Sequence, residues 1–395
     1  MAQDRDGHAG QRPLRDDGNT RGGHSRHVAR LQRSGRSAGM ICNERTGAQD
    51  DGRIGRNRFD RNRLRHMHNI AILDDFQNTA LRFGDWDSLR EHANITVFTN
   101  TISDEDDLVE RLQPYDILCV MRERTWFTQR ILSRLPNLKL LASTGPWNAA
   151  IDIEAAHELG ITVCGTASSP TAAAELAWAL ILAATRHIPS EVASFRNGGW
   201  QVSVGGDLHG RTIGLLGLGY TGGATARVAQ AFGMRTIAWS QNMTRESAAK
   251  HGALYVPKEE LFASSDILSV HVRLSDRTRD LIGAAELATM QPHALLVNTA
   301  RGPIVNEQAL IDALRAKRIA GAALDVFDQE PLPATHPFRS LDNVIATSHI
   351  GYVTDESYRI YYGESVENIR AWIGGTPVRV LTPAKREISY IAQSA

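Results

Sequence analysis

The sequence has little of what marks secreted, metal-binding or membrane proteins. It holds only three cysteines in 395 residues, Cys42, Cys119 and Cys164, and their spacing matches no metal-binding motif. We therefore expect no metal site. We also expect the cysteines to be free thiols in a reducing compartment, the cytoplasm. The longest apolar run, 176–184, is too short to cross a bilayer, and the N-terminal region has no apolar signal core. These absences predict a cytoplasmic protein that does not enter a membrane.

The chain also lacks net charge, and its charges are unevenly distributed. Residues 1–66 hold fifteen arginines, no lysine and eight acids, which leaves 29 basic and 36 acidic residues in the rest of the chain. Proteins that bind nucleic acid need a basic face to displace counterions from phosphates. The mildly acidic main body therefore predicts no nucleic-acid partner.

Residues 1–66 have no apolar residues at helical or strand spacing. Such a segment buries too little surface to offset its chain entropy, so we predict a disordered leader. An arginine-rich binding arm and an organellar transit segment are alternatives, although acids such as Asp16 and Asp17 interrupt the basic charge. We favour an upstream extension without a folded role, with Met67 as a natural start of the folded chain.

From Asn69 onward, short apolar runs alternate with segments of helical period, which is typical of parallel sheets covered by helices. A Gly-rich break over 198–210 precedes a second series of this kind, so we predict two α/β units in tandem. A helix over 171–186 is apolar on nearly every side and is expected to be buried between the units. A closing helix over 356–373 is expected to return the chain to the first unit.

The stretch 210–240 contains a candidate nucleotide cradle. Its first strand ends in G-x-G-x-x-G, formed by Gly217, Gly219 and Gly222, and a helix and a second strand follow. The first Gly permits a tight turn, the second lets the backbone approach a pyrophosphate, and the third lets the helix pack closely on the strand. The anion would rest on the helix N-terminus. The pattern therefore predicts a bound dinucleotide.

Three later motifs follow the cradle in order: NTARG at 298–302, ALDVFDQEPLP at 323–333 and SHIG at 348–351. Together with the cradle they resemble the D-isomer-specific 2-hydroxyacid dehydrogenase family. This family includes phosphoglycerate dehydrogenases and glyoxylate/hydroxypyruvate reductases. The resemblance extends over roughly 69–381.

The resemblance implies two doubly wound parallel-sheet α/β domains with a cleft between them. A flavodoxin-like substrate domain would comprise 67–168 and 352–382, and a Rossmann NAD(P)-binding domain would comprise 169–351. The resemblance also implies a homodimer.

In that family the Arg of the NTARG-like motif, the Glu before Pro-Leu-Pro and the His of the HIG motif are catalytic. These roles fall on Arg301, Glu330 and His349. A planar guanidinium holds the carboxylate of a 2-keto acid and polarises its carbonyl. An imidazolium supplies the proton that the oxygen needs when hydride arrives, and a carboxylate orients the ring and favours its charged form.

The resemblance also implies further contacts with NAD or NADP. They lie at Tyr220, Thr221, Val272, Arg273, Thr278, Thr299, Ala300 and, for the nicotinamide amide, Asp325. At Arg273 the family usually has Pro, so this cation either attracts an anionic part of the cofactor or is a solvated surface residue. Ser240 stands where an acid usually bonds the ribose and repels a 2′-phosphate. With Arg245 nearby, we predict tolerance of both cofactors.

The expected substrate contacts depart most from the family pattern. Gly145 is kept in the loop STGPWNAAID, but Trp147 stands where the family has a second Gly whose N–H meets the substrate carboxylate. The ring either narrows the pocket or packs between the domains, and Asn148 offers a replacement donor. In RERT, at the end of the third strand, Arg122 and the second Arg either attract an anion in the cleft or pair with acids around them. Tyr352 replaces a common Gly and either reaches the substrate or packs.

These features predict an NAD(P)-dependent oxidoreductase that transfers hydride between the cofactor and a small 2-keto or D-2-hydroxy acid. The substrate would be of the glyoxylate, hydroxypyruvate or 3-phosphoglycerate type. A formate dehydrogenase is disfavoured because that branch pairs its His with Gln, whereas this chain has Glu330. The alternative is a cofactor-sensing interaction protein on the same fold. Its role would survive the loss of Arg301 or His349, while catalysis would not.

Overall fold

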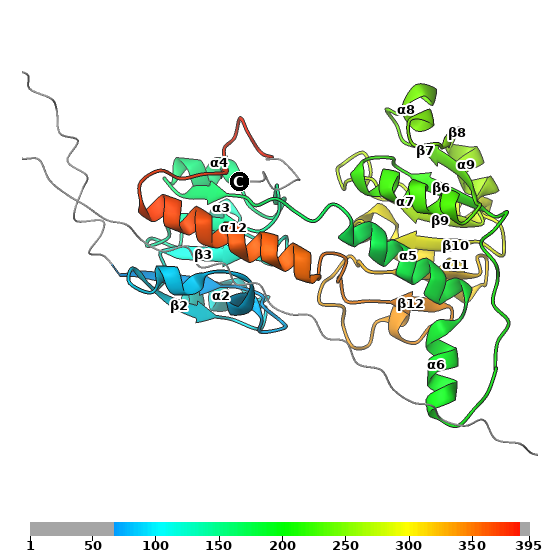
Figure 1. The fold of residues 1–395 in the computed structure, drawn as a ribbon, viewed down its shortest axis with the longest axis horizontal. Helices are drawn as coiled ribbons and strands as arrows, with labels where there is room; N and C mark the ends of the chain where they lie inside the picture. The colour runs from blue at the N-terminus through cyan, green and yellow to red at the C-terminus, as the bar shows by residue number, and fades with distance from the viewer. Residues whose placement is uncertain (1–66, 388–395) are drawn as a thin grey trace, which may run out of the picture. The chain divides into compact units, whose positions relative to one another are not determined.

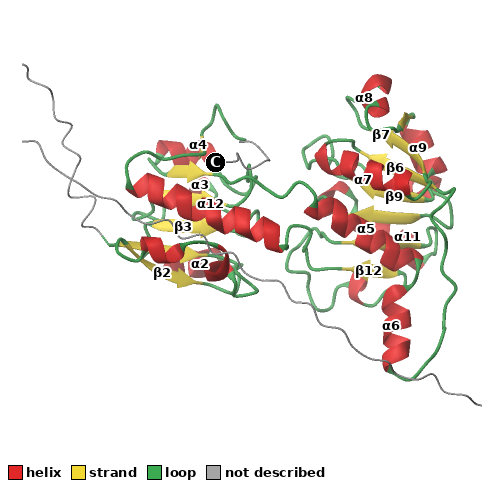
Figure 2. Ribbon diagram, viewed as in Figure 1, coloured by secondary structure: helices red, strands yellow, loops and turns green. Residues whose placement is uncertain are grey.

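Figure 1 shows the chain as a computed structural model, which describes residues 67–387. The leader predicted over 1–66 lies outside the described residues. Two β-sheets organise the described part of the chain, and helices lie on both faces of each sheet (Figure 2). The predicted fold class of two doubly wound α/β domains is therefore confirmed.

The first sheet has the strand order β13-β5-β4-β3-β1-β2, and all neighbours are parallel except β13 and β5. Its strands are β1 (His68–Ile72), β2 (Ala93–Val97), β3 (Ile117–Val120), β4 (Leu140–Ser143), β5 (Thr162–Cys164) and β13 (Val380–Leu381). The parallel strands follow the flavodoxin-like order 2-1-3-4-5, with the switch point between β1 and β3. Ligands of such sheets bind at the carboxyl ends near that point, where the RERT segment follows β3.

Helices cover both faces of the first sheet. They are α1 (Ala80–Phe83), η2 (Trp86–Leu89), α2 (Glu105–Leu112), α3 (Gln129–Leu132), α4 (Ile153–Glu158) and α12 (Asp355–Ile373). One buried apolar cluster joins the sheet to α2, α3 and α4, and another joins it to α1, η2 and α12. Helix α12 begins where the Thr354 side chain accepts a hydrogen bond from the Ser357 N–H, and it buries Tyr361 and Tyr362. The closing helix therefore returns the chain to the first domain, as predicted.

The second sheet has the order β12-β11-β10-β9-β6-β7-β8, with every pair parallel. Its strands are β6 (Thr212–Leu216), β7 (Arg235–Trp239), β8 (Leu254–Tyr255), β9 (Ile267–Val270), β10 (Leu295–Asn298), β11 (Gly321–Leu324) and β12 (Val344–Ala346). Read from β8, this is the Rossmann order 3-2-1-4-5-6 with one further strand. The switch point lies between β6 and β9, beside the glycine cradle.

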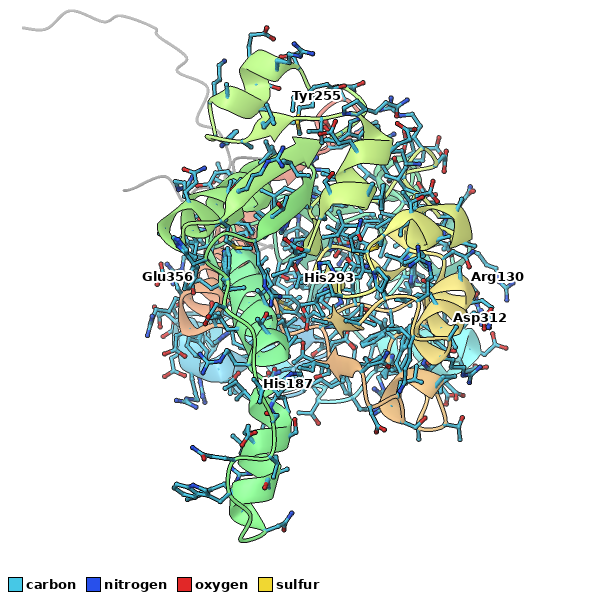
Figure 3. The ribbon with its side chains drawn as sticks, turned by 90° about the vertical axis from the view of Figure 1, so that its right-hand side faces the viewer. Arg130, His187, Tyr255, His293, Asp312 and Glu356 are labelled. Atoms are coloured by element: carbon cyan, nitrogen blue, oxygen red, sulfur yellow. The ribbon has the colours of Figure 1, made fainter. Side chains whose placement is uncertain are left out.

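Helices also cover both faces of the second sheet, and a separate buried apolar cluster lies on each face. The helices of this part of the chain are α5 (Ala172–Thr185), α6 (Ile188–Arg196), α7 (Tyr220–Ala231), α8 (Arg245–Ala249), α9 (Lys258–Ser264), α10 (Ala284–Thr289), η3 (Gly302–Ile304), α11 (Glu307–Arg315) and η4 (Pro337–Arg339). Helix α6 contains no buried residue, and Figure 3 shows it extending away from the sheet beyond His187.

The surroundings of α5 differ from the prediction. The helix forms where expected, but it packs on β10, β11 and β12 and against α7. Its other side, with Glu175, Ala179 and Leu182, is exposed. The helix therefore covers one face of the second sheet and is not buried on nearly every side as predicted, because this side carries the charged Glu175 and the small Ala179, which lose little by staying in water. Neither α5 nor any other helix within 67–387 has the length and apolar character needed to cross a membrane.

Candidate active site

The three residues expected to carry catalysis follow neighbouring strands of the second sheet. Arg301 comes after β10, Glu330 lies in the loop after β11, and His349 lies in the loop after β12. Because the carboxyl ends of parallel strands meet at one edge of a sheet, these loops lie together. His349 Nδ1 is 2.6 Å from Glu330 Oε2. The structure therefore forms the predicted His–Glu pair and leaves Nε2 as the ring nitrogen for a ligand.

The Glu330 carboxylate is held by three donors. Its Oε1 accepts the Phe327 N–H at 3.0 Å, and its Oε2 accepts Arg124 Nη1 at 2.9 Å as well as His349 Nδ1. Burial by itself would raise the pKa of Glu330, but the hydrogen bond from His349 and the charge of Arg124 outweigh burial and hold this pKa below its ordinary value. The carboxylate is therefore ionised at neutral pH, so Nδ1 carries the proton and donates it.

Arg301 is bound to a carboxylate of the first domain. Its Nη2 lies 2.9 Å from Glu123 Oε2, and its Nη1 donates to the Ala300 carbonyl at 2.7 Å. Burial would raise the pKa of Glu123, but the charges of Arg122 and Arg301 lower it to about 2. His349 also lies within electrostatic reach of Glu123. Glu123 is therefore a carboxylate on which both the Arg301 guanidinium and the His349 imidazole act.

Arg122 lies against Gly145 of the predicted substrate loop. Gly145 has φ +89°, and a Cβ on it would lie 1.6 Å from Arg122 Nη1. Arg122 and His349 have φ of +48° and +55°, in the left-handed region. That conformation costs an L-residue roughly 1–2 kcal/mol, and such strain collects at functional sites. The Gly145 N–H donates to Thr166 Oγ1 at 2.7 Å, so this glycine shapes the loop.

Two other predicted substrate contacts are engaged within the protein. Asn148 is buried, and its amide nitrogen donates to the Arg122 carbonyl at 2.7 Å and to Ser143 Oγ at 3.0 Å. This leaves no amide hydrogen for the donor role that we predicted. The Trp147 ring lies 5.6 Å from the Arg273 guanidinium carbon, in cation–π contact with the loop after β9. The contact supports the interpretation that this ring packs between the domains.

The glycine cradle fits a dinucleotide in the way that its motif predicts. Gly217 has φ +100°, and a Cβ on Gly222 would lie 2.2 Å from the Gly217 carbonyl oxygen. A Cβ on Gly219, by contrast, would meet no atom of the described chain within 4 Å. Space is therefore open where a pyrophosphate would approach the backbone. The N-cap residue of α7 is Gly219, which has no side chain to cap the first turn, and a helix N-terminus of this kind suits a bound anion.

The other expected cofactor contacts surround the switch point of the second sheet. Val272 packs beside Gly217, and Thr278 Oγ1 donates to the Arg273 carbonyl at 2.6 Å, which closes this loop. Thr299 Oγ1 is buried and has no hydrogen-bond partner among the residues that the structure describes. A buried hydroxyl of this kind suits a polar ligand. Partly exposed residues at the same edge are Tyr220, Thr221, Ser240 and Ala300.

Two residues near the cofactor site have roles that the sequence did not reveal. Asp325 is fully buried and accepts hydrogen bonds from Thr347 Oγ1 at 2.6 Å and from the Ile350 and Gly351 N–H groups at 2.8 Å each. It therefore fixes the loop that carries His349, and its contact with nicotinamide stays a prediction. Arg273 forms a bidentate ion pair with Glu387, with its nitrogens at 2.8 and 3.1 Å from the carboxylate oxygens.

A cavity of about 730 Å³ borders the His–Glu pair. Glu330 and His349 line it from the second domain, and Phe76, Gln77 and Arg124 line it from the first. Its volume exceeds that of a small keto acid and is typical of ligand sites.

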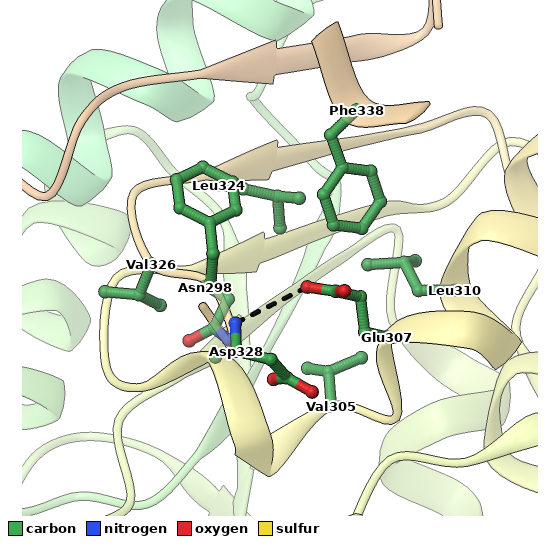
Figure 4. A pocket seen from close by; sticks show the side chains of 10 residues that line it. Asn298, Val305, Glu307, Leu310, Leu324, Val326, Asp328 and Phe338 are labelled. Carbon is green, nitrogen blue, oxygen red and sulfur yellow. Dashed lines mark hydrogen bonds between the residues drawn. The ribbon is translucent and has the colours of Figure 1, made fainter. Parts of the chain in front are cut away.

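A much smaller cavity, of about 10 Å³, lies between β11 and α11, where Glu307 and Asp328 meet (Figure 4). The Asp328 N–H donates to Glu307 Oε2 at 3.4 Å. Burial, together with the charge of Glu307, raises the pKa of Asp328 to about 6. The space holds about one water molecule, so it is no substrate site.

Comparison with known proteins decides the family. The sequence model described as D-isomer specific 2-hydroxyacid dehydrogenase, NAD binding domain, matches residues 178–351. The glyoxylate reductase of Aeropyrum pernix is 41% identical over 265 residues, which are 64% of this chain and 79% of that protein. This chain belongs to the D-isomer-specific 2-hydroxyacid dehydrogenase family. The predicted family, the oxidoreductase class and the NAD(P) cofactor class are therefore confirmed.

Further members of the family extend the comparison. The hydroxypyruvate reductase of Thermotoga maritima is 38% identical over 278 residues, 69% of this chain and 89% of that protein. The D-3-phosphoglycerate dehydrogenase of Methanocaldococcus jannaschii is 36% identical over 297 residues, 74% of this chain and 55% of that protein. The chain thus spans about half the length of this relative. A solved phosphoglycerate oxidoreductase from Vibrio cholerae has a TM-score of 0.75 at 40% identity and covers 78% of this chain and 100% of its own.

Sequence reasoning missed two partners of the catalytic candidates in this family member. Glu123 contacts Arg301, and Arg124 contacts Glu330, over sequence separations of 178 and 206 residues. The charges of the RERT motif indicated that this segment could lie at the site. They did not indicate which acidic or basic residue each side chain contacts.

Proposed function

We propose that the chain reduces a small 2-keto acid with one carboxylate, such as glyoxylate or hydroxypyruvate, and oxidises the corresponding D-2-hydroxy acid in reverse. Arg301 binds the substrate carboxylate and polarises the carbonyl, His349 is the general acid, and Glu330 orients His349. The observation that carries this proposal is the 2.6 Å contact of His349 Nδ1 with an ionised Glu330 at the carboxyl edge of a dinucleotide fold.

The chemistry divides between cofactor and protein. When bound, NAD(P)H supplies the hydride that is added to the carbonyl carbon. The carbonyl oxygen gains negative charge, and His349 Nε2 donates the proton that neutralises it. Glu330 stabilises the imidazolium before this transfer and keeps the ring oriented after it. In the reverse direction, neutral His349 takes the hydroxyl proton.

The charges of the site support a monocarboxylate as substrate. Three arginines and two carboxylates surround it, namely Arg122, Arg124, Arg301, Glu123 and Glu330. With both carboxylates ionised, these five groups carry one net positive charge, and protonated His349 adds a second. Two positive charges match one substrate carboxylate and the negative charge that develops on its carbonyl oxygen. A phosphate group would add up to two further negative charges to a site that already holds two carboxylates, which favours glyoxylate or hydroxypyruvate over a phosphorylated keto acid.

A panel assay tests the proposal. We expect oxidation of NADH or NADPH with glyoxylate and hydroxypyruvate, and at least about tenfold lower kcat/KM with 3-phosphohydroxypyruvate. Tenfold corresponds to about 1.4 kcal/mol of electrostatic repulsion between the phosphate and the carboxylates of the site. His349→Gln should lower kcat by about 10²–10⁴, the usual effect of removing a general acid, and leave NADPH affinity unchanged. Binding of NADPH without turnover of any keto acid would instead support the cofactor-sensing interaction protein.

Cofactor choice is expected to be permissive. Ser240 carries no charge to repel a 2′-phosphate, and Arg245 lies on helix α8 beyond the residues that directly follow the strand. We propose that NADH and NADPH both serve. A preference above about a thousandfold in kcat/KM, roughly 4 kcal/mol, would contradict this proposal.

We also propose that two copies of the chain associate through α6 and the segment after it. Phe195, Trp200 and Val204 are 68%, 75% and 93% exposed. A surface of large apolar side chains favours a protein partner, and the resemblance implies a second copy. Light scattering should give the mass of a dimer, and the double variant Phe195→Ser, Trp200→Ser should shift this mass toward that of the monomer.

Two further expectations stay proposals. They are the domain limits, 67–168 with 352–382 and 169–351, and the cytoplasmic location.

A further inference from the structure

Arg124 is the residue of the first domain that contacts the His–Glu pair most extensively. It lies in the loop between β3 and α3, and its side chain is 12% exposed. Its Nη1 donates to Glu330 Oε2 at 2.9 Å, its Nη2 to the His349 carbonyl at 2.8 Å, and its Nε to Tyr352 Oη at 3.0 Å. One guanidinium therefore contacts both members of the pair and the tyrosine that follows the HIG motif.

The contact with Glu330 is made to the oxygen that also accepts His349 Nδ1. Oε2 receives two donors and Oε1 receives the Phe327 N–H, so the carboxylate is fixed in both position and rotation. A carboxylate fixed in this way holds the imidazole in one orientation and one tautomer.

The contact with the His349 carbonyl acts on the backbone. His349 has φ +55°, a left-handed conformation that costs roughly 1–2 kcal/mol. Asp325 binds the N–H groups of the two following residues from within the second domain. Arg124 binds the carbonyl of His349 itself from the first domain. The strained backbone is therefore held from both sides.

The groups around Arg124 favour a role in positioning the His–Glu pair over a role in binding the substrate. The charged and titratable groups that act on it are Glu330, Tyr352 and Asp74. Burial raises the pKa of Tyr352, so its phenol stays protonated while it accepts from Nε. Each of its three guanidinium nitrogens donates to a protein group, so Arg124 is held toward Glu330, His349 and Tyr352.

We propose that Arg124 is a positioning residue for the general acid: it orients His349 and Glu330 only while the loop after β3 lies on the loops after β11 and β12. The orientation of the proton donor thus depends on contact between the two domains. This inference rests on the proposed function, since it assigns a partner to the same general acid.

Kinetics with chemical rescue test the role in catalysis. Arg124→Ala should lower kcat for glyoxylate reduction by about 10- to 100-fold, as loss of an orienting partner usually does, with NADPH affinity unchanged. Because Arg124 lines the 730 Å³ cavity, millimolar guanidinium should enter and restore part of the lost rate. Arg124→Lys should be intermediate, since an ammonium keeps the charge without the planar fork. The matched control is Arg130→Ala, which removes a side chain that is 73% exposed and paired with Glu105 (Figure 3).

A spectroscopic measurement keeps the inference testable without turnover. The short Nδ1–H···Oε2 hydrogen bond should give a low-field proton NMR signal that disappears in His349→Gln. We expect this signal to shift or broaden in Arg124→Ala and to stay in place in Arg130→Ala. An unchanged signal in Arg124→Ala, or an unchanged kcat, would overturn the inference. A wild-type protein that reduces no keto acid would instead contradict the proposed function, and the NMR signal would still decide the role of Arg124.

Discussion

Replacing Glu123 by Gln should destabilise the protein while increasing its affinity for anions. The change removes one buried negative charge but nearly preserves the size of the side chain. Glu123 is 13% exposed, and its Oε2 lies 2.9 Å from Arg301 Nη2 and 3.8 Å from Arg122 Nη2. The substitution therefore leaves two guanidinium groups close together without the carboxylate between them.

The size of the effect follows from the proton affinity of Glu123. Its pKa is about 2 in the folded protein against an ordinary value of 4.5. At about 1.4 kcal/mol per tenfold change in affinity, ionised Glu123 stabilises the fold by at most about 3 kcal/mol. Because the folded pKa is the lower one, this stabilisation is fully present above the ordinary pKa and is lost as the pH falls from 4.5 toward 2. The Glu123→Gln variant lacks this stabilisation at every pH.

Urea unfolding at neutral pH, followed by tryptophan fluorescence, measures the loss. The matched control is Glu105→Gln, because Glu105 also contacts two arginines, Arg130 at 2.7 Å and Arg134 at 3.3 Å, but lies nearer the surface. A pair in that setting contributes about 1 kcal/mol or less. If Glu123→Gln costs no more than Glu105→Gln, the electrostatic reasoning about this site is wrong.

Anion binding supplies the second half of the prediction. Oxalate is a keto-acid analogue with two carboxylates, and Glu123 would repel it. Removing one charge about 5 Å away, at an effective dielectric constant near 20, changes the interaction by about 3 kcal/mol before solvent screening. We therefore expect oxalate to inhibit Glu123→Gln at least about tenfold more strongly than the wild type. Equal inhibition constants would show that Glu123 does not face the bound anion.

Three further outcomes are expected. Arg301→Lys should lower kcat/KM by about 10²–10³, because one ammonium cannot bind the substrate carboxylate and the carbonyl together. Steady-state kinetics should show this loss, while the affinity for NADPH should stay unchanged. Burial lowers the pKa of His271 from 6.5 to about 4. The free energy of unfolding should therefore fall by up to about 3 kcal/mol as the pH drops from 6.5 to 4, and His271→Asn should remove this pH dependence. The raised pKa of Asp328, about 6, means that its ionised form opposes folding. Asp328→Asn should therefore raise the free energy of unfolding at pH 8, by no more than about 1 kcal/mol because the side chain is partly exposed, and this gain should vanish as the pH falls below the ordinary pKa of 3.8.

The sequence by itself determined the fold class and the order of the elements. Short apolar runs that alternate with segments of helical period are typical of a sheet with helices on both faces, and this local pattern does not depend on distant contacts. The same holds for the cradle, because the needs of Gly217, Gly219 and Gly222 arise within one strand–turn–helix unit. The motifs also placed Arg301, Glu330 and His349 at strand ends.

Tertiary structure alone decided how these groups are held. Arg124 and Glu330 are 206 residues apart, and no periodicity relates them. Asn148 offered a donor in the sequence, yet its hydrogens go to Arg122 and Ser143, since a buried loop must satisfy its own polar groups first. Local pattern specifies which side chains reach the site. Long-range packing specifies which charged groups they contact there, because electrostatic interactions depend on distance in space and not on separation along the chain.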